Sequence, residues 1–301
     1  MTKILFIGDV VGKGGRKILR EVLPQWREKY QPDAVIVNVE NLAHGKGVTL
    51  KTLAELDQLD IDCYTSGNHI FKKGDLSVEC FEKYDKLIRP ANYPSNLPGH
   101  GYYRFSKEIQ SASVLQRKSD TLSAPSDGAS PPKGEKNKVL RSMQQFLVIN
   151  LSGQVFMEKQ FDGAIDNPFL AVDKLILDQS QKGDIIIVDL HAEATSEKVA
   201  FGYYVDGRVT AMLGTHTHVP TADCRMLPGG TAYTSDVGMT GALNGVLGVK
   251  KENALKKFLD PNAKFKNEPE EDGALQINGV LIEVESEKGK VESITKLYQE
   301  I

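Results

Sequence analysis

Two histidines separated by one residue follow a short apolar segment in the second half of the chain. His216 and His218 lie in the sequence Gly214-Thr-His-Thr-His218, directly after the apolar run 209–213. Histidines at positions i and i+2 of an extended or turning backbone cannot both pack into one hydrophobic face. Both can point to a common place beyond the end of a strand. Since imidazole is the commonest metal ligand among side chains, the motif indicates a metal site.

The same arrangement, a polar cluster after an apolar run, occurs at four further places. These clusters are Gly8-Asp9, Glu40-Asn41, Gly67-Asn68-His69 and Asp189-Leu190-His191. Each has an ordinary explanation when taken alone, because Asp and Asn cap helices and form turns, and a single His is usually just hydrogen-bonded. Five such clusters would need five independent explanations. We therefore favour one metal centre that collects all of them, and with it an enzyme.

The types of donor atom restrict the metal. Carboxylate, amide oxygen and imidazole, with no cysteine among them, suit Mn, Fe or Zn, and we expect Fe or Mn with Zn as the alternative. About seven donors are too many for one tetrahedral ion, and a carboxylate can bridge. The set therefore predicts two ions about 3.5–4 Å apart, which lower the pKa of a bridging water and stabilise an in-line phosphoryl displacement.

Alternating strand and helix patterns must position these clusters. The apolar runs 4–7, 34–37 and 62–66 are typical of buried strands, and apolar residues recur at helical spacing in 16–30 and 50–59. This order predicts an α/β fold with parallel pairing, in which a ligand binds beyond the carboxyl ends of the strands.

Further elements complete the predicted fold. They are helices at 75–84 and 169–179, strands at 102–105, 145–150, 184–189, 209–213 and 231–234, a loop at 236–241, and a hairpin formed by 275–285 and 291–297.

Length and composition favour one domain that spans residues 1–301. The chain has 301 residues and no Pro-rich linker between two self-contained halves. Residues 106–143 are rich in Ser, Lys, Gln, Pro and Gly, a composition that buries little surface, so we expect a mobile insertion there. A second polar stretch, 262–273, is expected to be exposed.

Charge and cysteine content exclude several classes of protein. A net charge of -3 gives no reason to expect broad binding to nucleic acid or to a membrane surface. The three cysteines show neither CxxC spacing nor a disulfide framework, which suits a reducing compartment. No secretion signal begins the sequence, and no segment approaches the roughly 18 to 20 apolar residues of a membrane span. We expect a cytoplasmic protein.

A phosphate-binding loop is the first alternative to a metal centre, because Gly8-Asp-Val-Val-Gly12-Lys13-Gly14 contains the right residue types. The Walker pattern needs four residues between its glycines and Ser or Thr after the Lys, whereas three residues and Gly14 occur here. No G-x-G-x-x-G follows this strand either. Neither phosphate loop is supported.

Six motifs together resemble a known family. They are Ile7-Gly-Asp9-Val-Val-Gly12, Asn38-Val-Glu40-Asn41 with Gly45-Lys-Gly47, Gly67-Asn68-His69, Arg89-Pro-Ala-Asn-Tyr-Pro94, Gly214-Thr-His216-Thr-His218 and Asp236-Val-Gly-Met-Thr-Gly241. In number and order they resemble the YmdB-like bacterial metallophosphoesterases, described as 2′,3′-cyclic-nucleotide 2′-phosphodiesterases, of the calcineurin-like superfamily. The resemblance covers nearly the whole chain apart from the insertion after Phe105. It implies two packed β-sheets flanked by helices, with the site at the strand ends.

The resemblance also implies individual roles. Asp9 and His218 would hold the first ion, Glu40 would bridge both ions, and Asn68, His191 and His216 would complete the second. Asn41 would lie beside the first ion as a ligand or a phosphate-oxygen donor. His69 would be the general acid that protonates the leaving oxygen or stabilises charge there. The loops near Asn92-Tyr93 and Met239-Thr240 would shape the substrate pocket.

Four positions depart from related patterns. Val11 stands where most of the superfamily has a second histidine, and Glu40 replaces its usual second Asp. Both features match the YmdB-like branch. Within that branch, His44 occupies the place of a small residue and Phe71-Lys72-Lys73 replaces the usual aromatic-Asp pair. These changes are expected to narrow the pocket and to alter the helix after His69.

Our hypothesis is a di-metal phosphodiesterase for a 2′,3′-cyclic nucleotide or a related small diester. A metal-bridging hydroxide would attack phosphorus while His69 assists the leaving group. The alternatives are a phosphomonoesterase such as a nucleotidase on the same core, and a non-catalytic, RNA-associated regulatory module. A homo-oligomer is also expected.

Overall fold

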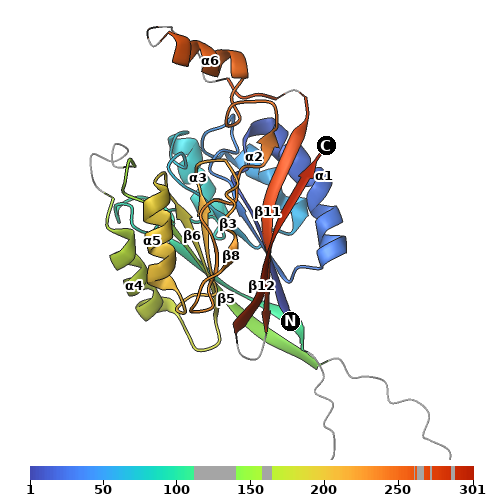
Figure 1. Cartoon of the computed structure of the whole chain (residues 1–301), viewed down its shortest axis with the longest axis vertical. Coiled ribbons are helices and arrows are strands. Elements are labelled where there is room, and N and C mark those ends of the chain that lie inside the picture. Colours follow the sequence, from blue (N-terminus) through green and yellow to red (C-terminus); the bar gives the residue numbers. More distant parts are fainter. Residues whose placement is uncertain (112–139, 158–164, 261, 263–267, 272, 286–288) are drawn as a thin grey trace, which may run out of the picture.

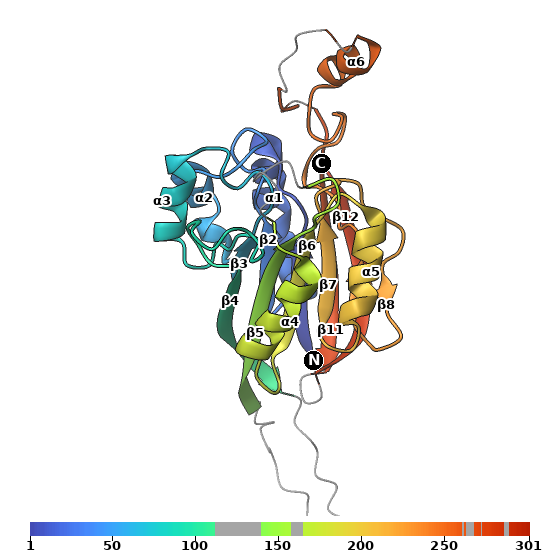
Figure 2. The same cartoon turned by 90° about the vertical axis from the view of Figure 1, so that its left-hand side faces the viewer.

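A computed structural model describes residues 1–111, 140–157, 165–260, 262, 268–271, 273–285 and 289–301. Its strands form two sheets that pack face to face between helices (Figures 1 and 2). The first sheet has the order β10-β11-β1-β2-β3, with β12 paired to β11, and the second has the order β4-β5-β6-β7-β9-β8. The predicted pair of packed sheets is therefore confirmed.

The first sheet is parallel where it carries site residues and antiparallel beyond them. Its strands are β1 (Thr2–Ile7), β2 (Ala34–Asn38), β3 (Cys63–Thr65), β10 (Gly241–Ala242), β11 (Leu275–Glu285) and β12 (Lys290–Glu300). β1 pairs with β2 and β2 with β3 in parallel, while β11 runs antiparallel to β1, β10 and β12. The carboxyl ends of β1, β2 and β3 consequently lie at one edge.

The second sheet repeats this arrangement. Its strands are β4 (Tyr102–Ser111), β5 (Leu140–Ser152), β6 (Ile185–His191), β7 (Ala211–Thr215), β8 (Arg225–Met226) and β9 (Ala232–Thr234). The pairs β5–β6, β6–β7 and β7–β9 are parallel, and β4 and β8 add antiparallel edges. In both sheets the parallel strands place their carboxyl ends together, as the sequence predicts.

Helices cover the two outer faces of the sheets. The helices of the described structure are α1 (Gly12–Tyr30), α2 (Leu50–Ala54), a 3-10 turn (Asp57–Leu59), α3 (Asp75–Lys83), α4 (Pro168–Gln179), α5 (Thr195–Val205) and α6 (Lys251–Leu259), of which all but α6 pack on the sheets. α1, α2 and α3 lie outside the first sheet, and α4 and α5 lie outside the second (Figure 2). α6 stands away from the body in both views and buries none of its residues.

The part of β1 formed by residues 4–7 is apolar without interruption because both of its faces are covered. Ile4 and Phe6 belong to the cluster of side chains between the two sheets, whereas Leu5 and Ile7 pack against α1 on the outer face. A strand covered on both faces has no position at which a polar side chain could reach water. Asp9, the second residue after this strand, is buried as well.

Several elements differ from the predictions. α1 begins at Gly12, four residues earlier than predicted, because Gly14 and Gly15 let the helix approach the first sheet closely. The predicted helix 50–59 is α2 followed by the 3-10 turn, and the predicted loop 236–241 ends in the short strand β10. In α4, Val172 is buried, but Phe169, Leu175 and Ile176 are only partly buried. α5, α6 and β8 were not predicted.

Regular structure extends into both ends of the predicted insertion at 106–143. Residues 106–111 continue β4 and residues 140–143 begin β5, and the two strands pair as far as Ser111 and Leu140. Residues 112–139, the centre of the predicted insertion, lie outside the described residues, as do residues 263–267 and 272 of the polar stretch 262–273. Within the part of the chain that is described, no helix has the length and apolar character needed to cross a lipid bilayer.

The start of α1 generates a stability prediction. A Cβ at Gly15 would lie 2.5 Å from the backbone oxygen of Thr240, whereas a Cβ at Gly14 would lie 3.0 Å from the flexible end of the Leu275 side chain. Gly15→Ala should therefore lower the free energy of unfolding by about 1–3 kcal/mol through overpacking.

The neighbouring change Gly14→Ala serves as the matched control. Leu275 can rotate away at a small cost. Alanine stabilises a helix by roughly 0.5–1 kcal/mol relative to glycine, which offsets that cost, so the free energy of unfolding of this variant should be close to that of the unmodified protein. Urea denaturation of both variants measures the difference. Equal stability of the two variants would contradict the close approach of Gly15 to Thr240.

Candidate metal centre

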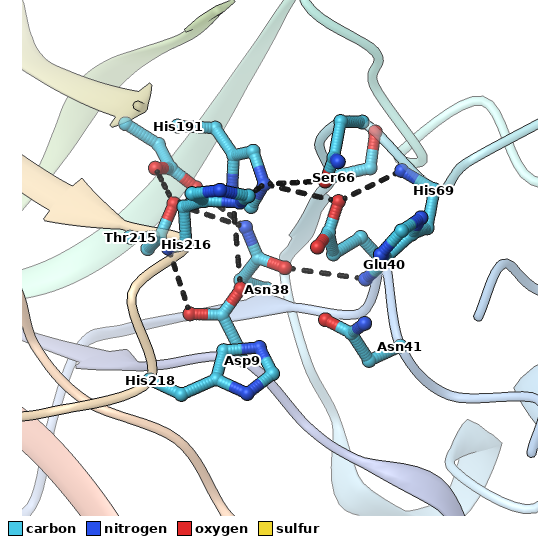
Figure 3. A network of polar contacts seen from close by, with 12 residues as sticks. Asp9, Asn38, Glu40, Asn41, Ser66, His69, His191, Thr215, His216 and His218 are labelled. Carbon is cyan, nitrogen blue, oxygen red and sulfur yellow. Dashed lines mark hydrogen bonds and ion pairs between the residues drawn. The ribbon is translucent and has the colours of Figure 1, made fainter. Parts of the chain in front are cut away.

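The ends of five parallel strands bring the predicted ligands to one place (Figure 3). Asp9 follows β1, Glu40 and Asn41 follow β2, and Asn68 follows β3. From the second sheet, His191 ends β6, and His216 and His218 follow β7. Ligand atoms of Glu40, His191 and His216 lie within 4.8 Å of one another, and so do those of Asp9, Glu40 and His218. Glu40 belongs to both groups, which is the position expected of a bridging carboxylate.

In the first of these groups, three ligand atoms lie around His191 Nε2 when Asn68 is included. His191 Nε2 lies 3.1 Å from Glu40 Oε2 and 3.1 Å from Asn68 Oδ1. His216 Nδ1 lies 3.0 Å from the same His191 Nε2. Whether these atoms can bond to one another depends on where the two imidazole protons are located.

The other nitrogen of His191 fixes its tautomer. Thr215 donates its hydroxyl proton to Asp189 Oδ1 at 2.7 Å, and Asp189 also accepts a bond from Asn38 at 3.0 Å. The Thr215 oxygen is therefore left to accept from His191 Nδ1, which lies 2.9 Å away. In the neutral ring Nε2 then carries a lone pair and faces the centre.

The tautomer of His216 is fixed in the same way. Its Nε2 lies 2.9 Å from Glu193 Oε2, so this nitrogen carries the proton and Nδ1 presents a lone pair inwards. In the neutral state, the lone pairs of His191 Nε2 and His216 Nδ1 then face each other at 3.0 Å, with Glu40 Oε2 and Asn68 Oδ1 each 3.1 Å from the same His191 nitrogen. Such an arrangement is unfavourable in a buried place unless a cation lies among the acceptors. These residues therefore fit a metal ion.

The second group contains two oxygen atoms that fit a metal ion equally well. Asp9 Oδ1 and Asn41 Oδ1 are buried and have no hydrogen-bond partner among the described residues. Asp9 Oδ2 accepts from the backbone of His216 at 3.2 Å, and the Asn41 amide nitrogen donates to Gly45 at 2.9 Å. These bonds fix both side chains and leave one oxygen of each without a donor. Buried oxygen atoms in this state are rare without a cation or water.

The pKa values of the proposed ligands also indicate that a cation fits this site. Burial raises the pKa of Asp9 to about 6. Burial opposes the charged forms of Glu40 and His191 as well, but their contact outweighs it, holding the pKa of Glu40 below its usual range and raising the pKa of His191 to about 9. Burial and the neighbouring His191 lower the pKa of His216 to about 3. The protein alone therefore needs a positive charge here at neutral pH, and a metal ion can supply it in place of the proton.

His69, the predicted general acid, lies beside Glu40. Its backbone N–H donates to Glu40 Oε2 at 3.1 Å, and its side-chain Nδ1 is buried without a hydrogen-bond partner in the described structure. Burial lowers the pKa of His69, and the nearby Lys46 and Lys72 act in the same direction, against the opposing effect of Glu40. His44, like these two lysines, is exposed. The residues that depart from the branch pattern therefore leave the ligand set intact.

The four residues predicted to contact substrate are all buried, and Asn92 also has a structural role. Both N–H donors of its amide are engaged, with Ser152 at 2.7 Å and Asp166 at 2.8 Å, and its oxygen accepts from Ser152 at 2.8 Å. Asn92 therefore fastens its loop to β5, and its contact with substrate stays a prediction. Tyr93 and Met239 are each 2 % exposed, and Thr240 Oγ1 is buried without a partner among the described residues.

Sequence reasoning missed the residues that orient the ligands. Asn38, Thr215 and Glu193 each lie within two residues of a predicted ligand. The Asn38 side chain donates to Asp189, Thr215 accepts from His191 Nδ1, and Glu193 accepts from His216 Nε2. Their positions close to the ligands in sequence were the only available signal. A polar residue beside a ligand is too common to be distinguished without the geometry.

Comparison with known proteins identifies the family. The sequence matches the family described as YmdB-like protein over residues 5–131 and 117–297. The chain belongs to the YmdB-like family. It is 38% identical over 295 residues to the 2′,3′-cyclic-nucleotide 2′-phosphodiesterase of Bacillus subtilis (strain 168), and the match covers 98% of this chain and 96% of that protein.

Solved structures agree with this membership. A phosphatase from Mycoplasma pneumoniae has a TM-score of 0.80 and 33% sequence identity, covering 99% of this chain and 93% of that chain. The calcineurin-like phosphoesterase YfkN from Bacillus subtilis has a TM-score of 0.57 at 12% identity, covering 99% of this chain and 90% of that chain, and it shows the fold alone. The predicted calcineurin-like fold is confirmed. The prediction of an enzyme of the phosphodiesterase class is confirmed as well.

The two groups of ligands generate a prediction for metal binding. The protein should bind two Mn²⁺ ions per chain, and chelation should lower its thermal midpoint. A ligand present at 100 times its Kd stabilises a folded protein by about 2.7 kcal/mol, so the shift should be several degrees. His218→Ala should bind one ion fewer, because His218 belongs to only one group.

His100→Ala is the matched control, since His100 is an exposed histidine outside both groups. Equilibrium dialysis followed by elemental analysis measures the stoichiometry of both variants. Two ions bound to His218→Ala, or none bound to the unmodified protein, would contradict the assignment.

Proposed function

We propose that this protein is a di-metal phosphodiesterase that hydrolyses a 2′,3′-cyclic nucleotide or a related small diester. The observation that carries the proposal is the pair of ligand groups that share Glu40. The relative from Bacillus subtilis supports the substrate class by its name and its 38% identity over 98% of this chain. The donor set favours Mn or Fe over Zn.

Each ligand residue has a defined task in this proposal. Asp9, Asn41 and His218 hold one cation, Asn68, His191 and His216 hold the other, and Glu40 contacts both. When bound, two such ions lower the pKa of a water between them and neutralise charge on the phosphoryl oxygens. The hydrogen bonds to His191 and His216 mean that neither ring has to turn before it binds a cation, and His191 has only to give up the proton that Glu40 stabilises.

His69 is the proposed general acid. It lies next to Asn68 in sequence, and its backbone lies beside Glu40 (Figure 3), so we propose that its imidazole reaches a phosphate bound at the ligand groups. Burial keeps its pKa below the ordinary value, and a bound anionic phosphate would raise that pKa again by stabilising the imidazolium. The ring would then become protonated together with substrate binding, and it could donate that proton to the leaving oxygen.

The pocket walls are assigned from burial. The loop that contains Tyr93 is fastened to β5 by Asn92, and Thr240 is tied to Asp9 through a backbone bond of 2.8 Å. We propose that Tyr93 and Thr240 shape the space beside the cations, with Met239 packed behind them. A cytoplasmic location, a homo-oligomer and an association with RNA stay predictions.

The role of His69 can be tested by comparing leaving groups. An alkoxide needs a proton as it leaves, whereas p-nitrophenolate is a stable anion that leaves without one. His69→Ala should therefore lower kcat on 2′,3′-cyclic AMP by about 100- to 10,000-fold, the usual contribution of a general acid, and lower kcat on bis-p-nitrophenyl phosphate much less.

Metal content is the control in this experiment, because His69 is not a proposed ligand and two ions should remain bound. The unmodified enzyme should also lose kcat/KM on the cyclic nucleotide as pH rises past the lowered pKa of His69, since the protonated form is required. Equal losses on both substrates would show that His69 acts otherwise than as a proton donor.

Phosphomonoester hydrolysis is the second candidate, because the structural neighbour from Mycoplasma pneumoniae is named a phosphatase. The two activities are separated by comparing kcat/KM on 2′,3′-cyclic AMP with that on 3′-AMP and 5′-AMP, with the same Mn²⁺ supply. The proposal predicts the higher value for the cyclic diester. A higher value for either monoester would favour the phosphatase.

A further inference from the structure

The segment that carries two of the proposed ligands adopts an unusual backbone conformation. His216 has a φ of 101° and His218 a φ of 67°, which places both in a region that residues with a side chain rarely adopt. Backbone conformations of this kind cost of order 1–3 kcal/mol each and persist only where surrounding contacts hold them. The contacts that hold this segment therefore determine where the two imidazoles point.

A buried ion pair provides these contacts. Lys198 of α5 and Asp236 are each 1 % exposed, and Lys198 Nζ lies 2.7 Å from Asp236 Oδ2. The same Nζ donates to the backbone oxygen of Thr215 at 2.7 Å. Asp236 Oδ2 in turn accepts from both the backbone N–H of Thr217 at 3.0 Å and its hydroxyl at 2.8 Å.

These bonds hold the ligand segment at both sides of His216. Thr215 precedes that histidine, and Thr217 lies between it and His218. The other Asp236 oxygen accepts from Gly238 at 2.9 Å, which fixes the carboxylate from a third direction. A close backbone contact reinforces the arrangement, since a Cβ at Gly214 would lie 1.8 Å from the oxygen of Ser235.

Stability alone is a poor explanation for this ion pair. Burying two charges costs several kcal/mol per ion, and well-packed apolar residues of similar volume are often as stabilising. Neither side chain belongs to the two ligand groups, so neither is needed to bind a cation directly. What the pair provides that apolar residues could not is three hydrogen bonds to the segment 215–217.

We infer that Lys198 and Asp236 are positioning residues that hold His216 and His218 in the conformation required to bind two cations. The inference rests on the proposed metal centre, because it assigns the ion pair a role toward those ligands. Neither residue touches the reacting atoms. Both act through Thr215 and Thr217, and their effect should therefore appear in cation affinity before any catalytic step.

The test is the affinity of the full-length protein for Mn²⁺ alone, measured by isothermal titration calorimetry. Loss of a residue that orients a metal ligand typically weakens metal binding by 10- to 100-fold. Asp236→Asn and Lys198→Met should each weaken Mn²⁺ binding by about this factor. Mn²⁺ affinity that is unchanged in folded preparations of either variant would overturn the inference.

Asp184→Asn is the matched control. Asp184 accepts two bonds from Arg104 at 2.7 and 3.0 Å, and it precedes β6, whereas His191 ends that strand. This variant also breaks a largely buried ion pair, but at the opposite end of the sheet, so Mn²⁺ affinity should stay at the unmodified value. An equal loss of affinity in Asp184→Asn would mean that general destabilisation is the cause and would overturn the inference.

Thr217 supplies a second comparison that leaves the buried charges in place. Thr217→Val removes the hydroxyl bond to Asp236 and should weaken Mn²⁺ binding, whereas Thr217→Ser keeps the hydroxyl and should restore the affinity. This pair decides the question if the charge variants do not fold. Equal Mn²⁺ affinity of the valine and serine variants would then overturn the inference.

The outcomes separate this inference from the proposed function. An unmodified protein that binds two Mn²⁺ ions but hydrolyses no diester would overturn the proposed function alone, because the affinity comparison does not depend on activity. An unmodified protein that binds no Mn²⁺ would overturn both.

Discussion

Lone pairs that face one another across a buried space are the constraint on which this structure depends. His191 Nε2 and His216 Nδ1 are directed inwards because Thr215 and Glu193 engage their other nitrogens. Glu40 and Asn68 add oxygen atoms at the same place. Water can hydrate such atoms on a surface, but this cluster is largely buried, so a positive charge must offset their repulsion. The fold therefore keeps a cation site formed even though the repulsion between these atoms lowers its stability.

The sandwich explains how distant parts of the chain reach that site. Asp9, Glu40 and Asn68 come from consecutive parallel strands of one sheet, and His191, His216 and His218 come from consecutive parallel strands of the other. Since parallel strands end at one edge, two sheets packed face to face present two rows of ligands toward each other. The apolar layer between the sheets, which includes Phe6 and Phe146, fixes the spacing of those rows.

The sequence predicted which strand ends lie together, because each proposed ligand follows an apolar run. A strand buried on both faces leaves a clear signal, and a polar residue directly after it has few structural alternatives. The resemblance to the YmdB-like family then supplied the pairing of the two sheets, which periodicity does not contain. The hairpin formed by β11 and β12 was also predicted.

The missed features lack such a local signal. α5 presents no single apolar stripe, because it buries Glu197 and Lys198 together with Phe201 and Val205. The role of Lys198 depends on contacts to Thr215 and Asp236, which are 17 and 38 residues away in sequence. The bonds from Asn92 to backbone were not predicted, because an asparagine in a loop near a site looks the same in sequence whether or not it binds backbone. Only tertiary contacts distinguish these cases.

The central claim is that Glu40 lies between two cation positions, one in each group of ligands. A crystal structure of the protein soaked in Mn²⁺, with anomalous scattering recorded at the manganese absorption edge, tests this most directly. Two anomalous peaks on either side of the Glu40 carboxylate are predicted, one beside Asp9 and His218 and the other beside His191 and His216. A single peak, or peaks away from Glu40, would contradict the account.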